Sequence, residues 1–220
     1  MAGDGRVCRQ PDLRVKGGNI MAETILPSAK PRLSSEALLN RIAPFGIDRT
    51  RYPVIVAGIR GYYRDTMGAA AANDRNLYDD AIFIHSPSAM NAFNGNTDAS
   101  KVRSGWGFGA DKGMAMLKSG CWYAHGFGNH KGYPALTQKH ATVTVVRDGK
   151  NGANYEDTGW FGINIHRGGR TTTGSEGCQT LHPDQWGGFI GVVTGEAQRL
   201  FGAAWSSAVI PYVLMEDAPA

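Results

Sequence analysis

The chain has 220 residues, of which 42% are apolar and 19% charged, and its formal net charge is +4 at pH 7. This balance excludes global disorder, because enough apolar side chains are present to build a sizeable core. The 30 glycines are roughly twice the usual share of about 7% and follow no fixed period, which excludes collagen and solenoid repeats.

The first residues differ in composition from the rest. Residues 1–33 are polar and rich in Gly, Arg and Pro, which predicts a flexible N-terminal arm before a single domain over residues 34–220. The first 20 residues lack the continuous apolar segment of a secretory signal, and no stretch of 18 apolar residues predicts a transmembrane helix. Translation starts either at Met1 or at Met21, and both starts stay open.

Helix and strand signals follow along the domain. A serine cap and apolar spacing predict a short helix over residues 36–42. Residues 87–113, rich in Pro, Asn, Gly and Ser, are expected to form a long ordered loop. Apolar residues at steps of three and four after Pro183 predict a helix over 184–201. Runs of β-branched and aromatic residues predict strands at 53–59, 80–85, 121–125, 141–147, 160–166 and 208–215. This pattern is typical of an α+β domain that is mostly β.

A histidine and a cysteine are the main candidates for chemistry. Alternation in the strand that ends at His166 places Ile163 and Ile165 on one face and Asn164 and His166 on the other. A polar, glycine-rich loop then leads to Cys178. A thiol becomes nucleophilic near neutral pH when a base or a positive field lies close, and His166 is a rigidly held candidate base. We predict a nucleophilic pair; the alternative is an inert buried thiol beside a structural histidine.

Neighbouring residues suggest how such a pair would work. Gly177 allows a close approach of the backbone, so that nearby N–H groups form an oxyanion hole. Arg167 and Arg170 add positive field and are suited to bidentate binding of a substrate carboxylate.

The segment resembles the signature of the L,D-transpeptidase (YkuD-type) catalytic domain, in which a strand ending in His-Gly is followed by a loop and Ser/Thr-x-Gly-Cys. Residues 163–166 match the strand, and Ser175-Glu176-Gly177-Cys178 matches the nucleophile motif. The similarity extends over roughly residues 120–182, and residues 126–133 and 145–148 are similar to short phage and bacterial members. The resemblance implies an L,D-transpeptidase-like β-sandwich or barrel with two or three peripheral helices.

The resemblance also implies a reaction. Members of the family use a cysteine nucleophile, without a cofactor, on the L,D-linkage of peptidoglycan stem peptides. Carried over, Cys178 is acylated by the carbonyl of the third stem residue, and His166 is its base. A backbone carbonyl of Arg167 or Gly168 orients the imidazole.

The other site residues are carried over in the same way. The backbone N–H groups of Glu176, Gly177 and Cys178 bind the oxyanion, which puts Glu176 and Gly177 in the catalytic set. The expected substrate-binding residues are His125, His130, Ser175, Arg167 and Arg170.

The sequence departs from the family pattern at several points. Arg167 replaces the usual Gly after the histidine, and Glu176 stands where a His is common. Gln179-Thr180 replaces the usual apolar-Arg or apolar-Asn pair, and the loop from His to Cys is shorter than usual. The acceptor preference is therefore not carried over, and the choice between water and an amine stays open.

Two other patterns suggest alternative binding sites on weaker evidence. His125-x4-His130, with Cys121, His166 or His182, is a possible zinc site, although no HExxH or CxxC companion exists, and we expect no metal. The tryptophans at 106, 122 and 160 are suited to stacking on sugar rings but are expected mostly in the core.

We therefore expect a cysteine peptidase that acts on peptidoglycan or muropeptides as an L,D-carboxypeptidase or endopeptidase, in the manner of a phage endolysin. The alternatives are an L,D-transpeptidase that forms cross-links, a zinc-dependent wall peptidase and a non-catalytic wall-binding module. The mildly basic chain has no run of five or six like charges, which argues against a nucleic-acid partner. Without a signal peptide, the protein is expected in the cytoplasm, or at the wall after holin-type release if it is a phage enzyme.

Overall fold

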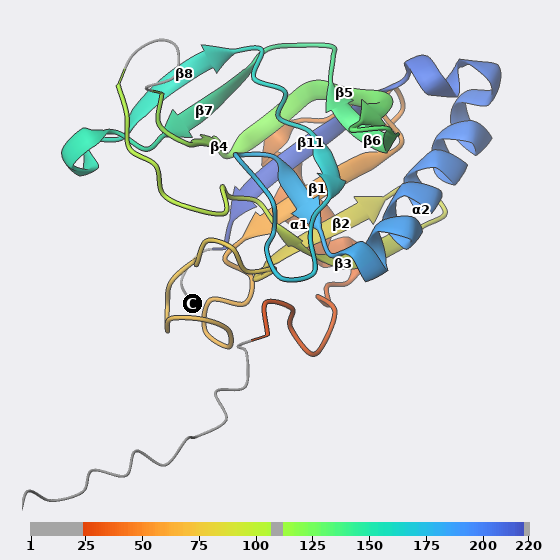
Figure 1. Cartoon of the computed structure of the whole chain (residues 1–220). Helices are drawn as coiled ribbons and strands as arrows, with labels where there is room; N and C mark the ends of the chain where they lie inside the picture. The colour runs from red at the N-terminus through yellow and green to blue at the C-terminus, as the bar shows by residue number, and fades with distance from the viewer. Residues whose placement is uncertain (1–23, 107–111, 218–220) are drawn as a thin grey trace, which may run out of the picture.

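A closed barrel of eight strands forms the centre of the protein (Figure 1). The computed structural model describes residues 24–106 and 112–217. Around the barrel the strands follow in the order β1-β11-β5-β6-β9-β10-β3-β2. Their bounds are β1 Ile55–Arg60, β2 Asp80–His85, β3 Met90–Asn96, β5 Gly120–His130, β6 Tyr133–Gln138, β9 Ile165–Arg167, β10 Gln179–Leu181 and β11 Val209–Glu216.

A smaller sheet and two helices surround the barrel. The sheet has the order β4-β7-β8, with bounds β4 Ala115–Leu117, β7 Val143–Arg147 and β8 Tyr155–Gly159. The described residues contain the α-helices α1 Ser35–Ile42 and α2 Pro183–Phe201 and the short 3₁₀ helices η1 Ala43–Phe45, η3 Lys150–Gly152 and η4 Gly202–Ser207. The predicted α+β, mostly β class is confirmed, and neither α-helix is long and apolar enough to cross a membrane.

Helix α2 lies along one side of the barrel (Figure 1) because one of its faces is apolar. Trp186, Phe189 and Val193 are buried on this face, and the Phe189 ring packs edge-on against Phe93 of β3 at a centroid distance of 5.5 Å. The helix begins after His182, whose Nδ1 accepts a hydrogen bond from the backbone N–H of Asp184 at 3.3 Å.

Two apolar clusters stabilise the domain. The larger one joins the barrel, α2 and the small sheet, and includes Leu117, Leu136 and Tyr212. The smaller one packs α1 on β1, β2 and β11 through Leu38 and Ile42. Truncation of a fully buried side chain of this size typically costs about 2–5 kcal/mol.

Two sequence predictions of secondary structure were wrong. The expected loop over 87–113 contains strand β3, which pairs with β2 along its full length. The expected strand over 160–166 is reduced to β9, because Gly162 has a φ of +69° and breaks the extended run. The side chain of Gln138 replaces the missing strand partner by accepting hydrogen bonds from the N–H groups of Phe161 and Ile163.

The predicted arm is packed on the domain where it is described. In residues 24–33, the carbonyl of Ile25 accepts a hydrogen bond from Tyr78 N–H at 2.8 Å. The carbonyl of Ala29 accepts one from the Tyr63 hydroxyl at 2.7 Å. These ten residues are therefore part of the folded domain, and the rest of the predicted arm lies outside the described residues.

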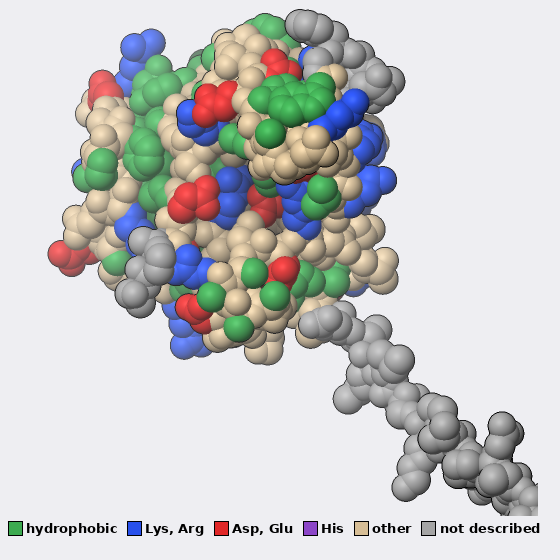
Figure 2. Space-filling view, turned by 90° about the vertical axis from the view of Figure 1, so that its left-hand side faces the viewer, with side chains coloured by type: hydrophobic (Ala, Val, Ile, Leu, Met, Phe, Trp, Pro, Cys, Tyr) green, Lys and Arg blue, Asp and Glu red, His purple; other side chains and the backbone are tan. Residues whose placement is uncertain are grey.

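Charges of both signs are mixed on the surface. On the face drawn in Figure 2, Lys and Arg side chains alternate with Asp, Glu and apolar side chains, and no single sign covers the face.

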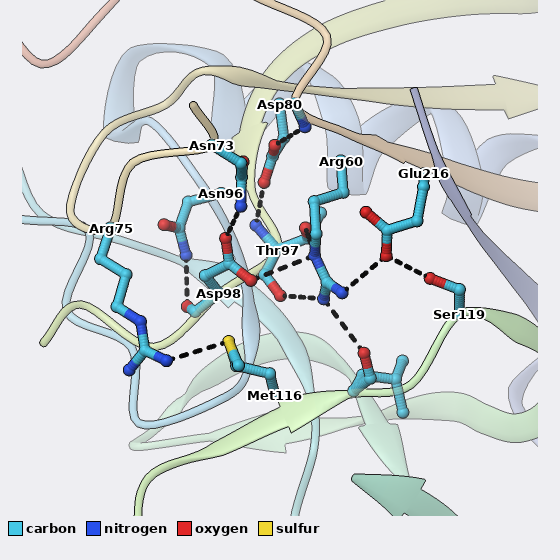
Figure 3. Close-up of polar contacts among 12 residues, drawn as sticks. Arg60, Asn73, Arg75, Asp80, Asn96, Thr97, Asp98, Met116, Ser119 and Glu216 are labelled. Atoms are coloured by element: carbon cyan, nitrogen blue, oxygen red, sulfur yellow. Dashed lines mark hydrogen bonds and ion pairs between the residues drawn. The ribbon is translucent and has the colours of Figure 1, made fainter. Parts of the chain in front are cut away.

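A buried ionic cluster joins four segments at one end of the barrel (Figure 3). The guanidinium of Arg60, at the end of β1, donates hydrogen bonds to the carbonyls of Thr97 (2.9 Å) and Leu117 (3.0 Å). It also pairs with Asp98 at 3.1 Å and Glu216 at 3.0 Å. One cation therefore ties β1 to β11, to β4 and to the segment after β3.

The same cluster contains more carboxyl groups than Arg60 can neutralise. Asp79, Asp80 and Asp98 are all fully or almost fully buried. The pKa of Asp79 is raised to about 7, chiefly by burial and also by the nearby charges of Asp98 and Asp74. Burial likewise raises the pKa of Asp80 well above its ordinary value.

We predict that Asp79 makes the protein less stable as the pH rises. Its pKa is about 7 in the folded chain and about 3.9 in an unfolded chain, so its full contribution is present below pH ~3.9 and is lost as the pH rises through about 7. Relative to Asp79→Asn, the free energy of unfolding of the wild type should fall by up to about 4 kcal/mol between pH 4 and pH 8. Urea denaturation at several pH values measures this difference, with Asp65→Asn at an exposed site as the control. A difference between wild type and Asp79→Asn that does not vary with pH would contradict the prediction.

Candidate active site

Parallel pairing of β9 with β10 brings the predicted histidine and cysteine together. His166 pairs with Thr180, and Ile165 pairs with Gln179, the residue after Cys178. Ile165 is buried in the core and His166 lines a cavity, as the alternation predicts, whereas Ile163 is buried in the core and also borders that cavity. A cavity of about 360 Å³ is lined by side chains that include Arg103, His130, Lys131, His166, Glu176 and Cys178.

The imidazole of His166 is held in one orientation. Its Nδ1 lies 2.8 Å from the carbonyl oxygen of Arg167, which accepts only, so Nδ1 carries the proton and the Nε2 lone pair is available. The Tyr133 hydroxyl donates to the same carbonyl at 3.1 Å and lies 3.2 Å from Nδ1. The orienting carbonyl is therefore that of Arg167 and not that of Gly168.

Burial keeps His166 neutral. The pKa of His166 is lowered to about 4, chiefly by burial and also by the neighbouring His130 and Lys131, against the opposing effect of the hydrogen bond to Arg167. A neutral imidazole at neutral pH is able to accept a proton, which a general base requires.

The tip of the β5–β6 hairpin packs on His166. Lys131 and Gly132 have φ values of +48° and +87°, as in a two-residue turn of type I′, and the turn places His130 opposite Tyr133. The His130 ring is stacked on the His166 ring, with centroids 4.0 Å apart and planes 13° apart. The base is therefore held by a carbonyl, a phenol and a second imidazole.

The thiol of Cys178 is half-buried and makes two hydrogen bonds with the backbone. Its Sγ accepts one from Asn164 N–H at 3.4 Å and donates one to the Gly162 carbonyl at 3.3 Å. Within residues 24–106 and 112–217 it makes none with His166. Proton transfer from the thiol to His166 would require the thiol to leave the Gly162 carbonyl.

The surroundings of the Cys178 thiol disfavour the thiolate. Burial raises the pKa of Cys178, and the charge of Glu176 adds to this effect. The N–H of Asn164 and the charge of Lys131 act in the opposite direction but do not cancel it. The site therefore contains a neutral thiol and a neutral imidazole, which requires removal of the proton during attack.

Ser175 has a structural role in the cysteine turn and does not line the cavity, contrary to its predicted role in substrate binding. The Ser175 side chain is buried. Its Oγ accepts a hydrogen bond from Gly177 N–H at 3.0 Å and donates one to the Cys178 carbonyl at 2.7 Å. Because the Gly177 N–H is already bonded to Ser175, the predicted oxyanion hole lacks this donor. Glu176, by contrast, is exposed and lines the cavity.

Gly177 is required for steric reasons. A Cβ at this position would lie 2.0 Å from the carbonyl oxygen of Ala115, and its φ of +138° is unfavourable for other residues. Behind it, the Tyr212 hydroxyl donates to Gln179 Oε1 at 2.8 Å, and Gln179 Nε2 donates to the Gly177 carbonyl at 3.3 Å. The cysteine turn is thus held from inside the barrel.

Three other predicted substrate-binding residues do not line the cavity. His125 is fully buried, with its Nε2 2.9 Å from the Ile163 carbonyl, and burial lowers its pKa to about 4. Arg167 lies over the Tyr133 ring at 4.8 Å, and exposed Arg170 pairs with Asp184 at 2.5 Å on the surface. Only His130 of the five expected substrate-binding residues lines the cavity.

Several residues of the site were not predicted. Tyr133, which binds the orienting carbonyl, follows a Lys-Gly pair that is typical of a tight hairpin turn, and this signal was available in the sequence. The cations that line the cavity are Arg103, Lys131 and Arg147, the last of which also pairs with Asp157 at 2.8 Å. These replace the predicted arginines as the positive charges near the thiol.

The histidines considered for a zinc site lie apart. Among the described residues, no group of three or more His, Cys, Asp or Glu is arranged to hold a metal ion, and His125 and His130 are not brought to one site.

The three tryptophans differ in burial. Trp122 packs against the core, whereas Trp106 and Trp160 are exposed, at 43% and 60%. The core expectation was therefore wrong for the last two.

Comparison with known proteins gives no family assignment, since the chain matches no protein-family model, no curated protein and no solved structure.

We predict that the Cys178 thiol is alkylated with a pH midpoint above the ordinary value of about 8.5. Glu176→Gln should lower the midpoint because it removes a negative charge, and Lys131→Gln should raise it because it removes a positive one. Iodoacetamide labelling against pH, followed by mass spectrometry of the Cys178 peptide, measures both shifts. A wild-type midpoint well below 8.5, or shifts of the same sign in the two variants, would show that these charges do not control the thiol.

We also predict that Gly177→Ala disrupts the cysteine turn. The clash with the Ala115 carbonyl and the positive φ should lower the free energy of unfolding by about 2–4 kcal/mol. Gly174→Ala is the matched control, because Gly174 also has a positive φ but its Cβ would meet no atom closer than 3.9 Å. Urea denaturation compares the two variants, and equal losses of stability would show that the contact with Ala115 is unimportant.

Proposed function

We propose that the protein is a cysteine peptidase of the L,D-transpeptidase kind that acts on the stem peptides of bacterial peptidoglycan. The observation that carries the proposal is that Cys178 and His166 line one cavity, with His166 Nδ1 bonded to the Arg167 carbonyl and Nε2 left available. The order of strand, histidine, loop and cysteine in a barrel supports an L,D-transpeptidase-like fold.

The proposed reaction proceeds through a thioester. Cys178 Sγ attacks the peptide carbonyl carbon as its proton passes to His166 Nε2, and the tetrahedral intermediate then expels the amine, which takes the proton from His166. The C–N bond is broken and a C–S bond formed. Water then attacks the thioester with His166 again as the base, which releases the acid and restores the thiol.

Hydrolysis is favoured over transfer by the connection between His166 and Cys178. This connection is short, and it is fixed to the body of the domain by Asn76, whose Oδ1 accepts hydrogen bonds from the hydroxyl of Thr172 (2.6 Å) and the N–H of Thr173 (3.0 Å). A short connection that is fixed in this way is the basis on which we propose water, rather than an amine, as the acceptor. If an amine acceptor binds instead, the same thioester forms a cross-link, and the protein is an L,D-transpeptidase.

We predict that the purified protein removes terminal D-Ala from tetrapeptide muropeptides or opens cross-linked dimers. Cys178→Ala should abolish the change, and His166→Ala should reduce its rate by roughly 10²–10⁴-fold because the general base is lost. Mass spectrometry of the muropeptides measures both, and Cys121→Ala, which changes the other described cysteine, serves as the matched control.

The products distinguish the alternatives. An increase in mass by exchange with added D-amino acid indicates a transpeptidase. Activity that survives Cys178→Ala and is lost with a chelator indicates a metal peptidase, and binding to sacculi without any product indicates a wall-binding module. Each of these three results would overturn the proposal of a cysteine hydrolase.

A further inference from the structure

The protonation of His130 is determined by its neighbours. The Asn164 side-chain oxygen accepts a hydrogen bond from Gln138 N–H at 2.9 Å, which turns the amide nitrogen of Asn164 toward His130. This nitrogen lies 3.2 Å from His130 Nδ1 and is able only to donate. His130 Nδ1 must therefore accept, and the single proton of the neutral ring is on Nε2.

The Nε2–H of His130 is a donor without a protein acceptor among the described residues. His130 lines the same cavity as Cys178 and is stacked on His166 at 4.0 Å. Burial lowers its pKa, and the charge of Lys131 lowers it further, so the ring is neutral at neutral pH. A neutral N–H donor with a defined tautomer is thus held beside the base.

The attacked carbonyl requires such a donor. Negative charge develops on its oxygen in the tetrahedral intermediate, and donors already in place stabilise it most. Several backbone donors near the thiol are occupied: Gly177 N–H is bonded to Ser175, Gln179 N–H to the Asn164 carbonyl, and Asn164 N–H to Cys178 Sγ. Of the three backbone donors expected for the oxyanion, those of Glu176 and Cys178 remain, and a side-chain donor would replace the one lost at Gly177.

We infer that His130 is a catalytic residue whose Nε2–H donates a hydrogen bond to the carbonyl oxygen that becomes the oxyanion during acylation of Cys178. The inference rests on the proposed function only in taking Cys178 as the nucleophile. Tyr133 and Asn164 are then positioning residues, because the first holds the base and the second sets the tautomer of His130.

The test separates acylation from alkylation of the same thiol. With p-nitrophenyl acetate, Cys178 Sγ forms a C–S bond to the carbonyl carbon through an oxyanion, p-nitrophenolate leaves with the electron pair of the broken C–O bond, and His166 takes the thiol proton. With iodoacetamide, Sγ displaces iodide at a saturated carbon, and no oxyanion forms. Both rates are followed by mass spectrometry of the Cys178 peptide, so the natural substrate is not needed.

The substitution His130→Phe keeps an aromatic ring for the stack on His166 but removes the N–H donor. It should lower the acylation rate roughly 10²-fold or more, the usual effect of losing one oxyanion donor, and leave the alkylation rate within about threefold of wild type. His130→Gln, which retains an N–H donor, should restore at least tenfold of the lost acylation. His140→Ala, at an exposed imidazole outside the cavity, is the control and should change neither rate.

Three results would overturn the inference. The first is an acylation rate in His130→Phe equal to that of the wild type. The second is an equal fall of the acylation and alkylation rates, which indicates that His130 only positions His166. The third is an acylation rate in His130→Gln that does not exceed that of His130→Phe. Long-range ¹H–¹⁵N NMR of the wild type should also show His130 as the Nε2–H tautomer, and an Nδ1–H tautomer would contradict it. If muropeptides are unchanged but the acylation results hold, the proposed substrate is wrong and the role of His130 stands.

Discussion

The site depends on the parallel pairing of β9 and β10. These two short strands are adjacent in the barrel although a polar connection separates them in the chain, and their register sets Thr180 against His166. Backbone hydrogen bonds in a parallel pair are evenly spaced, so this register determines where the residue before β10 lies. A change of register by one residue would turn the His166 side chain toward the core and Ile165 away from it.

Around this pairing, the donor and acceptor groups that hold the site find their hydrogen-bond partners within the protein. The cysteine turn is held on one side by Ser175 and on the other by Gln179 and Tyr212, and the base is held by a carbonyl. Burial favours the uncharged forms of Cys178 and His166, because neither a thiolate nor an imidazolium is well solvated there.

The sequence predicted local structure correctly where the spacing of apolar residues and the residues that begin or end an element indicate the same element. Helix α2 carries a strong local signal and is present, whereas only the end of the strand that leads to His166 is formed, as β9. The role of Tyr133 depends on the pairing of β6 with β9 at Leu136 and Ile165, which no local pattern encodes. His125 and His130 both lie in β5, which is longer than the strand predicted over 121–125. An odd separation along one strand directs two side chains to opposite faces. A predicted strand that reached residue 130 would therefore have indicated one buried and one accessible histidine.

The two-residue turn at Lys131 and Gly132 also limits how the chain can vary in length. The two side chains of this hairpin that contact His166, the His130 ring and the Tyr133 hydroxyl, flank this turn, and both turn residues have left-handed backbone angles. An inserted residue would convert the turn to another type and shift one strand relative to its partner. Loops elsewhere on such a barrel tolerate insertions and deletions, whereas this hairpin is expected to have the same length in every working version of the protein.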